Sequence, residues 1–175
     1  MWEPRLLLGA AVAEGRALGA GGLALVLGLA PAVLYLLLPE GSFDVWTYHL
    51  GVPWQYLQAG RAVLEHVVTG AHIPLTFEMA FALPLIAGDD RLAKGMVISC
   101  FAAASAVFAA YCLKRGRPAS AWLGPLLALS SGPMLLLIMM SKSDVPASSL
   151  FIAGATLQLA GAWAPGAFLL GLCVA

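Results

Sequence analysis

Three side chains that could do chemistry stand close together in the stretch Gly41-Ser-Phe-Asp-Val-Trp-Thr-Tyr-His-Leu50. The carboxylate of Asp44 could act as a general base, or its oxygens could hold a divalent cation. Tyr48 and His49 follow about one helical turn later, so on a helix they would share or flank the face of Asp44. The structural alternatives are a solvated carboxylate or helix N-cap for Asp44, and interfacial anchoring for Tyr48.

Two further acids, Glu78 and Asp144, are candidates for the same kind of site. Glu78 lies in an apolar stretch, where an ionisable side chain is costly enough that it usually faces a cavity or a partner. A shallow helix that lets Glu78 reach water is the alternative. Asp144 precedes Val145 and Pro146, where a helix-capping role would explain it completely. Only its expected position, on the same side as Asp44, favours a function.

The composition indicates what surrounds these residues. The chain is 61% hydrophobic and 10% charged with a mean hydropathy of +0.91, whereas about a quarter of the residues in a soluble domain are charged. An ordinary soluble domain is therefore excluded, and a formal net charge of +0 excludes a basic surface for nucleic acid. The three cysteines lie in apolar runs without a disulfide or metal-binding pattern. We expect an all-α polytopic membrane protein whose partner is the lipid bilayer.

Apolar runs of roughly 20 residues, enough to cross a bilayer core of about 30 Å, predict the membrane-crossing helices. Four runs qualify: 18–38, 92–113, 119–140 and 145–163. A fifth begins near residue 166 and continues to the end of the sequence. Because the sequence ends inside an apolar run, we take 1–175 as one transmembrane domain, the N-terminal part of a larger protein. We expect no cleavable signal, since Glu14 and Arg16 interrupt the earlier apolar stretch.

The segment 39–91 holds most of the polar side chains. Residues 53–68, which include Arg61, have the pattern of an amphipathic helix lying on a membrane surface. Residues 74–87 are apolar but too few for a crossing and are broken by Pro84, which favours an interfacial or re-entrant helix. The polar residues at 89–94 are typical of the start of a span, so we assign them no chemistry.

The basic residues predict the orientation of the chain. The tightest basic cluster, Lys114 to Arg117, and the residues Arg5 and Arg16 before the first span should all be cytoplasmic. Segment 39–91 must then stay outside as a whole, which brings 141–144 to the same outer face as Asp44. We therefore expect a multi-pass protein of a bacterial inner membrane, with a cytoplasmic N-terminus and an extracytoplasmic active face.

The order of these motifs resembles that of the polytopic GT-C glycosyltransferases, which use polyprenyl-phosphate sugar donors and include the protein O-mannosyltransferase-like (family 39-like) group. Nearly the whole chain is covered. Residues Phe43-Asp-Val-Trp-Thr-Tyr-His-Leu50 are close to the D-x-x-x-Y-H-L pattern of bacterial members. The elements that follow come in the same order as in that family. They are a surface helix, a Pro-led short helix with an acid (Ile73-Pro-Leu-Thr-Phe-Glu-Met79), a basic turn, and an acid after the third span (Ser141-Lys-Ser-Asp-Val145).

This resemblance implies roles for the residues already singled out. Asp44 matches the catalytic Asp of the first loop, and Asp144 matches the second-loop acid that often assists the acceptor or a metal. Glu78 matches an acid near the metal or donor in some members. Those families often have a pair of acids at the second position, whereas here Lys142 flanks a single acid. A divalent cation is therefore an open alternative and not a required cofactor.

The implied reaction transfers a glycosyl group from a polyprenyl phosphate to an acceptor. Asp44 would be the general base for the acceptor hydroxyl. The leaving phosphate needs a cation, and Arg61, His49 and Lys142 are available on the expected outer face, with Tyr48 as a further orienting group.

Two other functions stay open at this stage. In a transporter or channel subunit, Glu78 and Asp144 would line a translocation path. That hypothesis predicts acidic residues inside the spans, whereas the four apolar runs have none in their interiors. A non-catalytic membrane scaffold would leave Asp44 freely replaceable. Because the family's remaining spans are missing from 1–175, we expect this fragment alone to have no turnover.

Overall fold

The structure, a computed structural model, describes residues 4–61 and 76–174. Its regular elements are all helical, so this part of the chain is all-α as predicted. In chain order they are α1 Pro4–Tyr35, the π-helix η1 Val45–His49, α2 Gly51–Ala59, α3 Thr76–Ala80, α4 Ala82–Ile86, α5 Arg91–Lys114, α6 Pro118–Ser130, α7 Gly132–Met139, α8 Asp144–Leu159 and α9 Trp163–Val174.

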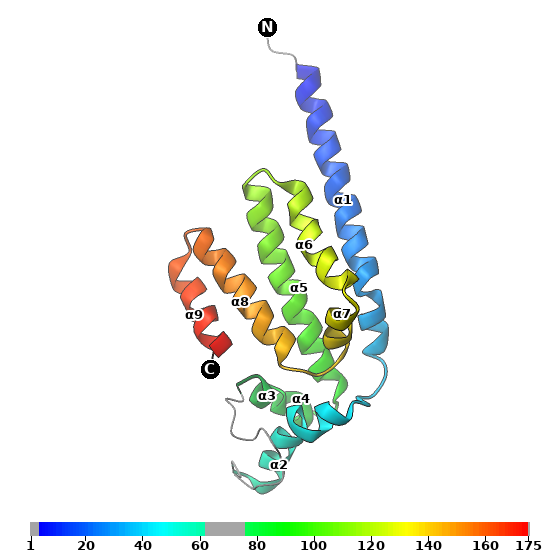
Figure 1. The fold of residues 1–175 in the computed structure, drawn as a ribbon, viewed down its shortest axis with the longest axis vertical. Helices are drawn as coiled ribbons and strands as arrows, with labels where there is room; N and C mark the ends of the chain where they lie inside the picture. Colours follow the sequence, from blue (N-terminus) through cyan, green and yellow to red (C-terminus); the bar gives the residue numbers. More distant parts are fainter. Residues whose placement is uncertain (1–3, 62–75, 175) are drawn as a thin grey trace.

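The long helices lie side by side, and the short helices α2, α3 and α4 gather at one end of them (Figure 1). Helix α5 packs against both α6 and α8, while α1 packs on α6 and α9 packs on α8. The α7–α8 connection reaches the end that holds the short helices, and the α5–α6 and α8–α9 turns lie at the opposite end. The two loops that carry Asp44 and Asp144 are therefore at the same end of the bundle.

The ends of the helices differ from the ends of the apolar runs. Helix α1 begins at Pro4, well before the expected residue 18, and is followed by a turn that closes on the carbonyls of Leu34 and Tyr35. Helix α8 stops at Leu159, short of the expected residue 163. There Gly161 adopts a φ of 85°, in the left-handed region that glycine tolerates, and turns the chain into α9.

The third apolar run, 119–140, forms two helices. The axes of α6 and α7 differ by 83°, and Ser131 between them is extended, with φ −79° and ψ 114°. Pro133 follows in the first turn of α7, where its missing N–H costs nothing, so it starts a new helix instead of extending the old one. The expected continuous helix through this run is therefore not what forms.

The described part of segment 39–91 is built from short helices. Helix α2 ends at Ala59 because Gly60 adopts a left-handed φ of 63°. The rest of the predicted surface helix, residues 62–68, lies outside the described residues. In place of one helix over 74–87 there are two helices of five residues each, α3 and α4. Each is about 8 Å long at 1.5 Å per residue, so neither crosses a bilayer core of about 30 Å.

Within the described part, α5 is the one helix long and apolar enough to cross a membrane, and the bent α6–α7 pair would be a second if it counts as one span. The apolar stretches Gly19–Tyr35 and Trp163–Cys173 are shorter. The four predicted crossings therefore stay a prediction.

Apolar side chains fill the interior and also cover much of the outside. The main core joins the short helices to the long ones through buried residues such as Leu50, Phe81 and Val97. On the outer surface, large apolar side chains are well exposed on α1, α6, α8 and α9, among them Leu34, Leu127, Phe151 and Phe168. Helices that are apolar all round are typical of membrane spans or of the core of a large protein.

Close packing of α1 on α6 depends on Gly21. A Cβ atom added at Gly21 would lie 2.2 Å from the Cγ and Cδ1 atoms of the Trp122 side chain, whereas one added at Gly19 would meet nothing within 4 Å. Small residues such as Gly21 let helix backbones approach closely.

This difference predicts opposite effects for two matched substitutions. Gly19→Ala should be neutral or stabilise by roughly 0.5–1 kcal/mol, because alanine is the better helix former. Gly21→Ala should destabilise by about 1–3 kcal/mol, because Trp122 must move. The measurement is the thermal unfolding of both variants in detergent, and equal midpoints would contradict the packing described for α1 and α6.

Candidate functional site

Lys94 fixes the place where the chain leaves α1. It lies in the first turn of α5 and is fully buried. Its Nζ donates to the carbonyl oxygens of Leu38 at 2.9 Å and Pro39 at 3.1 Å, and it stands 4.3 Å from the centroid of the Tyr35 ring. Carbonyls at a helix C-terminus lack partners within the helix, so this ammonium satisfies the turn that follows α1 and holds it against α5.

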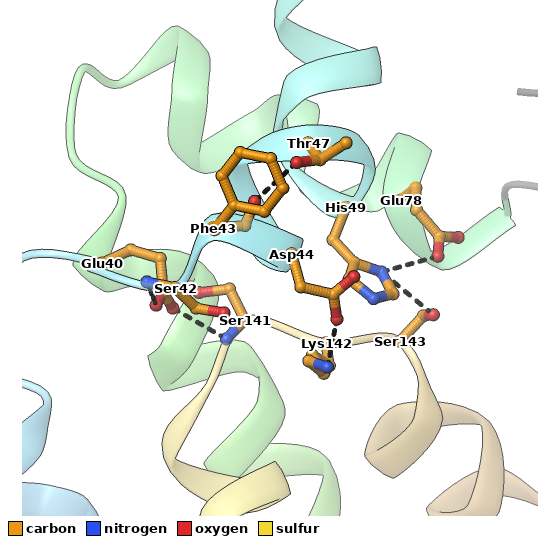
Figure 2. A network of polar contacts seen from close by, with 10 residues as sticks. All are labelled: Glu40, Ser42, Phe43, Asp44, Thr47, His49, Glu78, Ser141, Lys142 and Ser143. Atoms are coloured by element: carbon orange, nitrogen blue, oxygen red, sulfur yellow. Dashed lines mark hydrogen bonds and ion pairs between the residues drawn. The ribbon is translucent and has the colours of Figure 1, made fainter. Parts of the chain in front are cut away.

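Glu40 ties the same exit to the α7–α8 loop. Its buried carboxylate accepts the backbone N–H of Ser42 at 3.0 Å and that of Ser141 at 3.1 Å. Its own backbone N–H donates to the Asp90 carboxylate, and its carbonyl accepts the indole N–H of Trp46 at 2.8 Å. One residue therefore holds together three segments that are far apart in the sequence. Figure 2 shows its bonds to Ser42 and Ser141.

These anchors were missed in the sequence. Glu40, Asp90 and Lys94 look like the polar boundaries of two spans, and no role was expected for them. A lysine in the first turn of the next long apolar helix could have pointed to this role, because the last carbonyls of a helix need donors.

Asp44, Tyr48 and His49 are arranged by a π-helix. The Leu50 N–H bonds the Val45 carbonyl at 2.9 Å, five residues back, and both of these side chains are buried. The rings of Tyr48 and His49 lie side by side with centroids 4.0 Å apart and planes tilted by 41°. The expectation that both flank the face of Asp44 is met, although in π and not in α geometry.

Asp44 pairs with Lys142 from the α7–α8 loop (Figure 2). The lysine side chain is 18% exposed and that of Asp44 is 43% exposed. The hydrogen bond from Lys142 holds the pKa of Asp44 below its ordinary value, and the same bond raises the pKa of Lys142. Asp44 makes no side-chain cap bond, so the N-cap alternative does not describe it, whereas its carboxylate is both partly solvated and paired with Lys142. Both groups are charged at neutral pH.

His49 and Glu78 form a buried pair. The Nδ1 atom of His49 lies 3.0 Å from Oε1 of Glu78 and 3.4 Å from the hydroxyl of Ser143. Burial favours the neutral form of Glu78, but hydrogen bonds from His49, Ser143 and the backbone outweigh it, so the pKa of Glu78 is lowered. Glu78 is thus an ionised acceptor, and Nδ1 of His49 carries the hydrogen. The alternative that Glu78 reaches water does not hold, since only 6% of it is exposed.

Two predicted site residues stand apart from these pairs. Asp144 is exposed as the first residue of α8, and no hydrogen bond or ion pair in the described part joins it to Asp44. It is close enough to act electrostatically: burial raises the pKa of Tyr48, and the charges of Asp44 and Asp144 add to that rise. Arg61 is exposed beyond the end of α2 and makes no such bond to the Asp44 group among the described residues.

The arrangement does not fit a divalent cation. Across residues 4–61 and 76–174, no three His, Cys, Asp or Glu side chains cluster closely enough to hold a metal. The carboxylate of Asp44 is also occupied by an ammonium group. The chemistry proposed below therefore includes no step through a metal.

No family model, curated protein or solved structure matches this chain.

Replacing Lys94 tests the anchor beneath the site. Lys94→Met should lower the free energy of unfolding by about 2–3 kcal/mol, because two backbone carbonyls lose a charged donor from a fully buried side chain. Thermal unfolding in detergent measures the loss. Lys114→Met, at the exposed end of the same helix, is the matched control and should change stability by less than about 0.5 kcal/mol. Similar losses in the two variants would rule out the anchoring role.

Proposed function

We propose that this chain belongs to a polytopic membrane glycosyltransferase that moves a sugar from a polyprenyl phosphate to an acceptor hydroxyl. The observation that carries the proposal is the meeting of Asp44, His49 and Lys142 at one end of an apolar helical bundle. An ionised carboxylate, an oriented imidazole and an ammonium are the groups that such a transfer needs.

A membrane location is supported by the surface and the dimensions of the bundle. Helix α5 has 24 residues and is about 36 Å long, which exceeds a bilayer core of about 30 Å. The exposed apolar side chains of α1, α6, α8 and α9 would face lipid. A long isoprenoid donor stays in the bilayer, so its phosphate meets the enzyme at the depth of the headgroups, where an end of the bundle would lie.

The charges support placing the site on the outer face. The basic turn that includes Lys114, Arg115 and Arg117 lies at the end of the bundle opposite Asp44. Positively charged loops are cytoplasmic as a rule, so the Asp44 end would face outward.

Lys142 and Asp44 have complementary parts in the proposed transfer. The departing polyprenyl phosphate gains negative charge, and the ammonium of Lys142 stabilises it. When Lys142 turns toward the phosphate, the carboxylate of Asp44 is released to face the reacting carbon and the acceptor hydroxyl. It can then accept a hydrogen bond from that hydroxyl or stabilise positive charge at the anomeric carbon.

Substitution of Asp44 tests the proposed activity. Asp44→Asn in the full-length protein should reduce transfer from a polyprenyl-phosphate sugar by roughly 10²–10⁴-fold, because the amide carries no negative charge. Radiolabelled sugar in the acceptor fraction is the readout. Asp89→Asn is the control and should keep full transfer. The Asp89 carboxylate accepts the backbone N–H of Arg91 at 3.0 Å and makes no hydrogen bond to Asp44, His49 or Lys142 among the described residues. Undiminished transfer by Asp44→Asn would remove Asp44 from the catalytic site, whereas absence of transfer by the wild type would favour a scaffold.

Cysteine labelling tests the orientation separately from activity. In a variant without the native cysteines, Gln55→Cys on the exposed face of α2 should react with a membrane-impermeant maleimide from outside. Lys114→Cys at the other end of the bundle should react only after the membrane is opened. Labelling of Lys114→Cys from outside would overturn the proposed outer location of Asp44.

A further inference from the structure

We propose that His49 takes the proton of the acceptor hydroxyl through its Nε2 atom, with Glu78 as the positioning residue that orients the ring. The inference rests on the proposed glycosyl transfer and assigns its proton-transfer step. It leaves Asp44 with the electrostatic role and gives the proton to a residue for which the sequence predicted only an orienting or phosphate-binding part.

The first step of the argument is the tautomer of His49. Oε1 of Glu78 lies 3.0 Å from Nδ1, and an ionised carboxylate can only accept hydrogen bonds. Nδ1 must therefore carry the hydrogen, which leaves a lone pair on Nε2 of the neutral ring. A base held in one tautomer by a third group is the arrangement of activated acid–base sites in general.

The second step is the state of Nε2. His49 is 2% exposed, and Nε2 is buried without a hydrogen-bond partner among the described residues. The other buried side-chain atoms there without a partner belong to Trp122 and Ser141, so His49 is the ionisable one. A buried polar atom left unpaired costs about 1–3 kcal/mol. That cost is explained if Nε2 is kept for a group on the substrate.

The third step compares His49 with Asp44 as the base. Asp44 is held by Lys142, which lowers the pKa of its carboxyl and makes it a weaker proton acceptor. The two side chains are close enough for a charge on the His49 ring to lower the pKa of Asp44 further. The site therefore contains one carboxylate that stays ionised and one neighbouring ring nitrogen that is free.

The step balances as follows. The acceptor hydroxyl gives its proton to Nε2 while its oxygen forms a bond to the anomeric carbon. The bond from that carbon to the phosphate oxygen breaks, and polyprenyl phosphate leaves with the electron pair. The imidazolium that forms is balanced by the carboxylate of Glu78, and Nε2 later releases the proton to water.

The charges around His49 come from four elements. Asp44 and Tyr48 belong to η1 or directly precede it, Glu78 comes from α3, and Lys142 comes from the α7–α8 loop. Asp144 at the start of α8 acts on Tyr48 and Lys142 from further away. Three acids and one lysine thus lie around His49, so the removal of a single acid changes the net charge near the ring by one unit.

The test is the pH dependence of the transfer rate in the full-length protein. Transfer should fall at low pH as Nε2 becomes protonated. His49→Gln should lose roughly 10²–10⁴-fold in rate and also this acid limb. Glu78→Gln, whose amide oxygen can still accept from Nδ1, should keep the limb but move it to lower pH by about one to three pH units, because a nearby anion no longer favours the charged ring.

Two further variants separate this role from a structural one. Asp44→Asn should be slow but retain the acid limb, moved to lower pH by less than in Glu78→Gln, because Glu78 and not Asp44 is hydrogen-bonded to the ring among the described residues. Gln55→Ala on the exposed face of α2 should match the wild type throughout. An acid limb that survives in His49→Gln and disappears in Asp44→Asn would overturn the proposal, as would a Glu78→Gln variant that slows transfer without moving the limb.

Nitrogen NMR of the wild-type protein gives a readout that needs no activity. The His49 signal, identified by its loss in His49→Gln, should show hydrogen on Nδ1 and none on Nε2 at a pH above the acid limb of the transfer rate. A hydrogen on Nε2 would overturn the proposal even if transfer is observed. If the wild type transfers no sugar from any polyprenyl-phosphate donor, the proposed function fails and the proton-transfer role fails with it, whereas the tautomer is still judged by NMR.

Discussion

The buried ammonium of Lys94 is the interaction on which the functional end of this protein depends. By donating to the carbonyls of Leu38 and Pro39, it sets the point at which the chain leaves α1 and turns across α5. Glu40 comes next in the chain and uses its carboxylate to hold the backbone of Ser141, which lies 101 positions further on. These two contacts act together with the Asp44–Lys142 pair and the contact of His49 with Ser143 to hold the segment of Asp44 against the α7–α8 loop.

The site itself is built from two polar pairs of different character. The Asp44–Lys142 pair is partly exposed, so it is worth little to stability and its partners can separate when a charged ligand arrives. The His49–Glu78 pair is buried, so breaking it would strand a charge in a poor environment. One pair can therefore exchange partners while the other keeps a ring in a fixed orientation. This division suits the proposed transfer, in which the site would admit a phosphate without losing its geometry.

Much of the fold follows from local properties of the sequence. The apolar runs predict where α1, α5, α6, α8 and α9 form, and the short length of 74–87 predicts that it does not form a crossing helix. The helix ends were less predictable because they depend on single residues, such as the left-handed Gly60 and Gly161 and the proline that begins α7. The 83° break between α6 and α7 likewise interrupts an apolar run that has no polar residue to mark it other than two serines.

The sequence by itself determined the helical class, the apolar character of the bundle, and the short list of polar residues from which a site could be made. Asp44, His49, Glu78 and Lys142 were all on that list because ionisable groups are conspicuous in a chain with so few. Only the tertiary structure decided the partners: Lys142 with Asp44, Glu78 with His49, and Lys94 with the end of α1. The physical reason is distance along the chain, since helix periodicity carries information over a few residues, whereas these contacts join positions that only packing brings together.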